Sequence, residues 1–175
     1  MRLFARDAAP PADVITRAGL PAGERVLAAT RARDGRWLLA TRRRLVIVPS
    51  GVVEPAETIG WEQVEAADWS RDEDRLRVSQ VGEYGERRPV HEFVLDDPGR
   101  LLPFLRERVT ASVVLQRRVV VRETQGLFVV ARRVPDTGEI TWAYELDPGV
   151  DPDDPEVRRL AELGLQAAAE ELGLA

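Results

Sequence analysis

The first half of the chain alternates short apolar runs with turn-forming residues, which is the pattern of an antiparallel β-structure. Asp34-Gly35 is a strong hairpin signal, because both central positions of a type I′ turn require positive φ. This dipeptide predicts that residues 25–33 and 36–41 pair as strands. Five more strands are predicted, two of them within one segment that bends near Glu62: 44–48, 58–70, 75–81 and 88–95.

Over residues 96–112, apolar residues no longer recur at every second position but at every third or fourth, which predicts a helix. Its apolar positions form one stripe at spacings of three and four: Leu102, Leu105 and Val109. Asp97 can cap this helix with Pro98 at its first position, where the missing N–H costs nothing. Pro103 leaves two alternatives open, a kink at that residue or a helix that starts there.

Residues 113–175 predict three more strands and a second helix. The strands lie within 112–123, 126–134 and 139–146. An aspartate cap followed by Pro155 begins the helix, and Gly173 stands where a helix-ending glycine belongs. Small residues give the helix a narrow face that can approach a sheet closely: Val157, Leu160, Gly164 and Ala168.

Both faces of this three-stranded sheet carry large apolar side chains. One face holds Val113, Val119 and Val129, and the other holds Val114, Val120, Phe128 and Val130. A single helix covers only one face, so the second must meet the first domain or another subunit. We favour packing within the chain and keep a homodimer through the 113–146 sheet as the alternative.

Two stretches of the first half carry a family resemblance. In "LLATRRRLVIV", Thr41 and Arg44-Leu45 resemble the T-x-x-R-L strand pair of bacterial pleckstrin-homology-like (PH-like) and GRAM-like domains. "TIGWEQVEAADW" resembles the strand that follows in those domains, and seven strands with one helix match their plan. The whole chain also resembles uncharacterised conserved proteins of high-GC Gram-positive bacteria. The likeness implies binding, more often of proteins than of lipid head groups, rather than catalysis.

The expected fold class is therefore α+β. A PH-like seven-stranded antiparallel barrel or sandwich capped by a helix would be followed by a βββα extension. The expected organisation is an N-terminal arm at 1–21 with about one helical turn, a PH-like domain at 22–112, and the extension at 113–175, with one continuous domain as the alternative.

Composition narrows the functional classes. The 175 residues carry a net charge of −5, and the acidic excess lies in the C-terminal segment from residue 147 onward. This balance disfavours a general nucleic-acid binder. No apolar run reaches the roughly 18 residues of a membrane span, and the N-terminus has no signal-peptide pattern, so we expect a cytoplasmic protein with at most peripheral membrane contact.

The residue types that are absent exclude much chemistry. There is no cysteine and no lysine, which excludes thiol nucleophiles, Schiff bases and a Walker A phosphate site. His91 is the only histidine, and its strand places it with Phe93 and Leu95, which favours a half-buried structural role. We therefore expect no cofactor, no metal and no catalytic residue.

Two groups of carboxylates are candidate sites. Glu62, Glu65 and Asp68 suit a carboxylate hydrolase only if they face one substrate, and period-two alternation puts Glu65 on the other face. The acidic run at 147–156 lacks the spacing and glycine of an EF-hand, and helix capping explains much of it.

Arginine doublets are the remaining candidate contacts. Arg42, Arg43, Arg87 and Arg88 fall at predicted strand ends, where guanidinium groups can hold phosphate oxygens bidentately. Solvated strand ends that need charge are the simpler interpretation, and it is the one we favour. Arg44 is assigned to the fold rather than to contact.

The sequence thus favours a non-enzymatic module that binds an unknown protein partner or acts as a scaffold. The alternative is anionic ligand binding, to a lipid head group or nucleic-acid phosphate, through the arginine doublets. A carboxylate-based hydrolase is a remote alternative.

Overall fold

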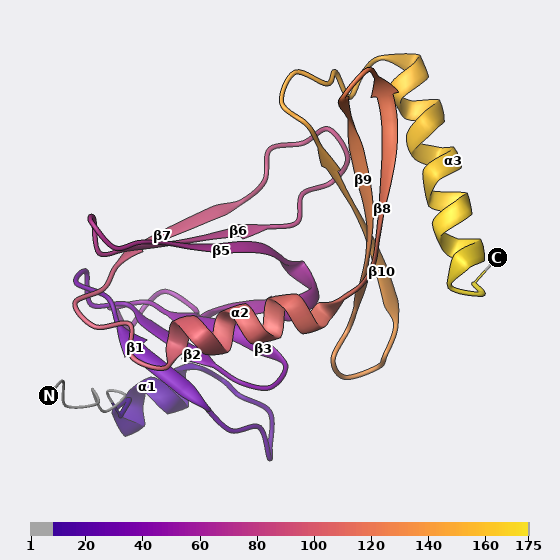
Figure 1. The fold of residues 1–175 in the computed structure, drawn as a ribbon. Helices are drawn as coiled ribbons and strands as arrows, with labels where there is room; N and C mark the ends of the chain where they lie inside the picture. Colours follow the sequence, from indigo (N-terminus) through magenta and orange to yellow (C-terminus); the bar gives the residue numbers. More distant parts are fainter. Residues whose placement is uncertain (1–8, 175) are drawn as a thin grey trace, which may run out of the picture. The chain divides into compact units, whose positions relative to one another are not determined.

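The computed structural model describes residues 9–174, so part of the predicted N-terminal arm lies outside the described residues. The described chain is α+β, with three helices, a short 3-10 turn and three separate antiparallel sheets (Figure 1). It divides into two compact units. The first contains the described residues up to Gln80 together with Val90–Ala111, and the second contains Val81–Pro89 and the described residues from Ser112 onward. The domain boundaries inferred from the sequence stay a prediction.

The first unit contains seven strands in two sheets. One sheet has the order β1-β2-β3-β4 and the other has the order β5-β6-β7. The strands are β1 (Ala28–Arg31), β2 (Trp37–Ala40), β3 (Arg44–Val48), β4 (Glu57–Gly60), β5 (Val64–Ser70), β6 (Arg75–Gln80) and β7 (Val90–Val94). The predicted succession of strands, including the bend near Glu62, is therefore confirmed.

The predicted barrel is wrong as a closed structure, because no ladder joins the two sheets among the described residues. The 3-10 turn η1 (Trp61–Gln63) separates β4 from β5 and directs the chain from one sheet into the other. A sandwich is compatible with this arrangement. The PH-like identity stays a prediction.

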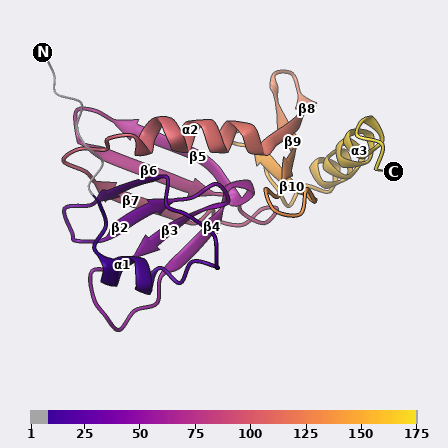
Figure 2. The ribbon, with the colours of Figure 1, turned by 90° about the horizontal axis from the view of Figure 1, so that it is seen from below.

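The core of the first unit lies between its two sheets. Leu38, Leu45 and Ile59 from one sheet meet Leu76 and Phe93 from the other, and all are buried. Helix α2 (Leu101–Ser112) contributes its own buried leucines to this core: Leu101 and Leu105. Figure 2 shows α2 running beside the strands.

A second core lies on the opposite face of the first sheet. Helix α1 (Ala12–Arg17) lies there, and its buried Val14 packs with Trp37, Leu39 and Val46. The helical turn predicted from Val14 is thus confirmed, and it covers apolar side chains that a four-stranded sheet would otherwise expose.

Helix α2 begins later than its capping signal indicated. Asp97 caps a turn by accepting a hydrogen bond from the Gly99 N–H (2.9 Å), and the helix starts at Leu101. Pro103 lies in the first turn, where its missing N–H breaks no helical hydrogen bond. Neither predicted alternative, a kink or a start at Pro103, describes this helix.

The Asp34-Gly35 hairpin forms, but not through the predicted type I′ turn. Only Gly35 has positive φ (90°), and its N–H donates to the Ala32 carbonyl (2.9 Å). The Ala32 N–H donates in turn to the Arg36 carbonyl (2.8 Å), which closes a three-residue loop. Such loops use a type I turn followed by a left-handed glycine, so Asp34 does not need positive φ.

The second unit is a three-stranded sheet covered by a helix, as predicted (Figure 1). Its sheet has the order β10-β9-β8. The elements are β8 (Val113–Arg122), β9 (Gln125–Arg133), β10 (Ile140–Leu146) and α3 (Pro155–Glu171).

Helix α3 follows its predicted signals, with one difference on its buried face. Asp154 caps it by accepting from the Glu156 N–H (2.8 Å), and Gly173 follows its end at φ 69°. The residues that face the sheet are Val157, Ala161, Gly164 and Ala168, so Ala161 takes the place predicted for Leu160.

The 81–89 segment belongs with this second unit and is anchored there by an aromatic contact. Tyr84 meets the ring of Tyr144 edge-on, with ring centroids 5.2 Å apart. Burial raises the pKa of the Tyr84 hydroxyl, the largest effect on it.

Candidate functional site

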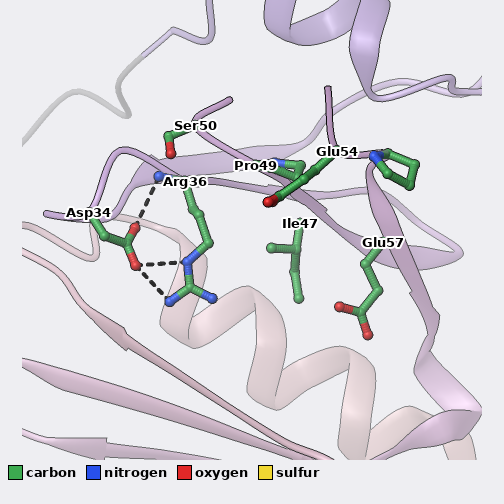
Figure 3. A pocket seen from close by; sticks show the side chains of 8 residues that line it. Asp34, Arg36, Ile47, Pro49, Ser50, Glu54 and Glu57 are labelled. Carbon is green, nitrogen blue, oxygen red and sulfur yellow. Dashed lines mark hydrogen bonds and ion pairs between the residues drawn. The ribbon is translucent and has the colours of Figure 1, made fainter. Parts of the chain in front are cut away.

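One concave feature of the first unit lies at one end of its first sheet. The β1–β2 loop and the connection from β3 to β4 line a cavity of about 410 Å³ (Figure 3). This volume lies within the range of small ligand sites. Its lining combines charged and apolar side chains: Asp34, Arg36, Ile47, Pro49, Ser50, Glu54, Pro55 and Glu57.

Arg36 is held firmly on one side of this cavity. Its Nε donates to Asp34 Oδ2 (2.7 Å) (Figure 3). Its Nη2 donates to the Glu92 carbonyl (2.7 Å). The guanidinium also lies over the Phe93 ring, 4.3 Å from its centroid. The hydrogen bond from Arg36 lowers the pKa of the Asp34 carboxyl. Arg36 therefore has little capacity left for a bound anion.

The other two carboxylates differ in their surroundings. Glu57 accepts a hydrogen bond from Gln80 (3.4 Å) and lies 3.3 Å from His91 Nε2. Glu54 makes no hydrogen bond or ion pair with the residues that the structure describes. Figure 3 shows Asp34 and Glu57 on opposite sides of the cavity with Ile47 between them.

An exposed apolar pair lies in the loop that contributes to the cavity lining. Val52 and Val53 lie in the connection between Ser50 and Glu54, both of which line the cavity. These two valines are 84% and 95% exposed, the highest values among the large exposed hydrophobic residues described. Contiguous exposed apolar side chains beside a cavity are typical of binding surfaces.

A second cavity of similar volume, about 410 Å³, lies at the same end of the unit, but its charges are paired. Arg33 contacts Asp74 (3.0 Å) and Asp96 (2.6 Å), and Arg75 contacts Glu92 (3.3 Å). The hydrogen bond that Arg33 donates to the Asp96 carboxylate is the main cause that raises the pKa of Arg33. The arginines of this cavity are thus engaged by carboxylates.

The predicted contact arginines fall in different units. Arg42 and Arg43 are exposed in the β2–β3 turn, at the end of the first sheet opposite the cavity. Arg87 and Arg88 are exposed in the 81–89 segment, which belongs to the second unit. Neither doublet lines the cavity. Contact of these four arginines with an anion or a partner stays a prediction.

Thr41 explains why the arginine run forms a turn. Its buried hydroxyl donates to Glu24 (2.5 Å) and accepts from the N–H groups of Arg43 and Arg44 (both 3.1 Å). Arg44 Nε lies 3.1 Å from the same Glu24 carboxylate. Thr41 and Arg44 of the T-x-x-R-L stretch therefore both contact Glu24, as the assignment of Arg44 to the fold anticipated.

Replacing Thr41 by valine is expected to lower the free energy of unfolding by about 1–3 kcal/mol, because it leaves two turn N–H groups without this acceptor and removes one hydrogen bond to Glu24. Urea unfolding followed by tryptophan fluorescence measures this change. Thr41→Ser keeps the hydroxyl and should lose less. A loss in Thr41→Val no larger than that in Thr41→Ser would contradict the weight given to the hydroxyl, because it would show that the methyl group contributes at least as much at this position.

The three carboxylates of the 62–68 segment do not face one common site in the structure. Glu62 lies in η1 and Glu65 lies at a β-bulge between Val64 and Ala66, so simple alternation does not hold across this segment. Asp68 is exposed. The described chain contains no group of three or more acidic or histidine side chains arranged to hold a metal ion.

The acidic run near α3 is engaged in local structure. Asp147 pairs with Arg118, and its carboxylate also accepts from the Gly126 N–H (2.8 Å). Asp154 caps α3, and Asp153 pairs with Arg158. These contacts, with capping, explain most of the acidic run.

Asp147 should make stability depend on acid pH. Its hydrogen bond from Arg118, followed by that from Gly126, lowers the pKa of its carboxyl below the ordinary value of 3.8. The folded state therefore binds fewer protons than the unfolded state in this range, and the stabilisation is present above pH 3.8 and lost as pH falls through the lowered pKa. Asp147→Asn should flatten this part of a plot of urea midpoint against pH, and an unchanged slope would assign the acid sensitivity to other groups.

The comparisons with known proteins give no assignment. No family model matches the sequence, no curated protein matches it, and no solved structure matches the fold. Among the described residues, no helix is long and apolar enough to cross a membrane. The cavity and its rim must therefore be interpreted from their own chemistry.

The cavity residues are not among the candidates predicted from the sequence. The segment after β3 is predicted only as a loop, although the two adjacent valines within this polar connection are a visible signal. Glu54 and Glu57 carried no signal, because only the folded chain brings them near Asp34. The partial burial predicted for His91 is observed: its side chain is 17% exposed, and its Nε2 lies 2.8 Å from Gln80 Nε2.

Proposed function

We propose that this protein is a non-catalytic binding module that recognises a protein partner through the β3–β4 connection and the adjacent cavity. The observation that carries the proposal is the exposed pair Val52 and Val53, which lies in the segment between two residues that line the cavity, Ser50 and Glu54. Burying two valines that are almost fully exposed gives a favourable binding term of about 1.5–3 kcal/mol for each side chain. The cavity supplies polar groups that orient a partner.

The chemistry of the chain supports a non-catalytic role. Without cysteine or lysine, nucleophilic catalysis would depend on hydroxyl or carboxylate groups. His91, the only histidine, lies between Gln80 and Glu57 with its ring stacked on Phe93. These contacts favour a structural role for the imidazole over proton transfer.

Comparative capture tests the proposal. The full-length protein, the Val52→Ser/Val53→Ser variant and a Leu163→Ser control are each used as bait in extract of the organism that encodes the protein. Leu163 is 49% exposed on α3, in the other unit, so its loss removes exposed apolar surface away from the cavity lining. All three should fold, because exposed substitutions usually change stability by less than about 0.5 kcal/mol.

The expected result is a protein retained by the wild-type chain and by the control but lost from the double valine variant. Titration of that purified protein against the three baits should then reproduce the difference. A partner that is retained equally by all three baits would overturn the proposed surface.

Anionic ligand binding through the arginines remains the competing proposal. Arg42 favours it, because this exposed side chain makes no hydrogen bond or ion pair with the residues that the structure describes. Sedimentation with vesicles rich in anionic lipid tests it. Under the protein-binding proposal, the wild type and Arg42→Ala/Arg43→Ala should both stay unbound. Salt-sensitive binding that the double variant loses would favour the anionic ligand.

The homodimer predicted through the 113–146 sheet is a separate proposal. Val120, on the face opposite α3, is 57% exposed and is the side chain that a second subunit would cover. Sedimentation equilibrium of the wild type and Val120→Ser tests it. A monomer at all concentrations would contradict a dimer.

A further inference from the structure

The cavity beside Val52 and Val53 has an excess of negative charge. Three carboxylates line it, Asp34, Glu54 and Glu57, against one guanidinium, that of Arg36. Arg36 already donates to Asp34 and to the Glu92 carbonyl. The positive charge in the cavity is therefore neutralised, and a net negative charge remains to act on a ligand.

Glu54 is the carboxylate of this cavity that is most available to a ligand. Glu54 has no partner among the described residues, whereas Glu57 shares its carboxylate with Gln80 and His91. Glu54 and Glu57 are both exposed, so a cation can approach their carboxylates from solvent. The apolar lining beside them suits the methylene chain of a long basic residue: Ile47, Pro49 and Pro55.

We propose that this cavity binds an arginine or lysine side chain of the protein partner, with Glu54 and Glu57 facing the cation. The proposal rests on the proposed function and adds the chemistry of the partner to it. The recognised segment would place an apolar residue beside the basic one, so that Val52 and Val53 are covered while the cation enters the cavity. Arginine fits such a site well, because its planar group can donate two hydrogen bonds to one carboxylate.

The charge of the site also argues against an anionic occupant. A phosphate group in the cavity would meet three carboxylates and a guanidinium that is already hydrogen-bonded. Electrostatic complementarity at an interface excludes partners of the same sign as well as attracting those of opposite sign. An acidic peptide should therefore bind more weakly than a basic one of the same length.

Selection from a library of random linear peptides tests the inference on the full-length protein. Peptides are selected on the wild type after those that bind the Val52→Ser/Val53→Ser variant have been removed. The expected result is enrichment of arginine or lysine next to an apolar residue.

The selected peptide is then titrated against Glu54→Gln/Glu57→Gln. Its affinity should fall about tenfold, which corresponds to ~1.4 kcal/mol of binding free energy. Glu86→Gln/Glu139→Gln is the matched control, because both residues are exposed in the other unit and the net charge changes equally. The control should bind like the wild type.

The outcomes separate this inference from the proposed function. Enriched peptides without a basic residue, or an affinity that Glu54→Gln/Glu57→Gln leaves unchanged, would overturn the cation site while leaving the peptide-binding surface in place. A wild-type selection with no enrichment would overturn both. Equal weakening by the two pairs of glutamine substitutions would assign the effect to overall charge and also overturn the cation site.

Discussion

Gly126→Ala should destabilise the second unit by about 4 kcal/mol or more, a loss beyond that of most single substitutions. A Cβ at this position would lie 2.0 Å from the Val119 carbonyl oxygen and 3.1 Å from the Val120 Cα. These are backbone atoms of the neighbouring strand, so no side-chain rotation relieves the overlap. The strands β8 and β9 would have to separate where their register already shifts. Amide hydrogen exchange across residues 113–146 measures the loss of protection.

Gly164→Ala is the matched comparison, because its new Cβ would meet side chains instead. The nearest atoms are Val119 Cγ2 (2.5 Å) and Val129 Cγ2 (3.2 Å). We expect a cost of about 1–3 kcal/mol from overpacking, reduced by the ~1 kcal/mol that alanine gains over glycine within a helix. Val119→Ala should restore room, so the double variant should lose less than the sum of the single losses. Similar effects of Gly126→Ala and Gly164→Ala would contradict the assigned backbone contact.

Trp61→Ala should lower the free energy of unfolding by about 3–5 kcal/mol, because it removes a fully buried aromatic side chain from the larger core. Trp61 Nε1 also donates to the Thr41 carbonyl (3.1 Å), and its ring meets Phe104 edge-on with centroids 6.2 Å apart. Trp61 therefore links the start of η1 to the β2–β3 turn and to α2. Urea unfolding followed by circular dichroism measures the change.

Trp61→Phe separates the hydrogen bond from the packing. It retains an aromatic ring but leaves the Thr41 carbonyl without its donor, so we expect a loss of about 1–3 kcal/mol. A Trp61→Ala loss no larger than that of Trp61→Phe would show that the ring contributes little to the core.

The order of strands and helices followed from local signals that the folded chain uses directly. The aspartate, proline and glycine around α3 act within a few residues of themselves, so the sequence alone placed that helix well. The glycine of the first hairpin likewise marked its turn. The turn is not of type I′, because a three-residue loop needs only one left-handed residue, and Gly35 supplies it.

Features that depend on distant residues could not be predicted in the same way. Alternation suggested the faces of strands, but the bulge at Glu65 and the turn η1 interrupt it. Whether seven strands close into a barrel depends on pairing between sheet edges, which the apolar pattern of each strand does not encode. The start of α2 at Leu101 depends on the local turn at Asp97, which competes with its role as a helix cap.

The candidate site was less predictable than the fold. Three adjacent like charges make the arginine run a candidate for anion contact. In the structure, Thr41 and Glu24 account for much of its conformation. The acidic cavity is assembled from the β1–β2 loop, the β3–β4 connection and the start of β4. Its charge is visible only when Asp34, Glu54 and Glu57 come together.

The most direct test of the proposed surface is a map of amide chemical-shift changes in the full-length ¹⁵N-labelled protein as the captured partner is added. Protein binding at the cavity predicts shifts concentrated at residues 34–36 and 47–57, and their loss in Val52→Ser/Val53→Ser. Shifts confined to the β2–β3 turn or to residues 113–146, with residues 47–57 unchanged, would contradict it.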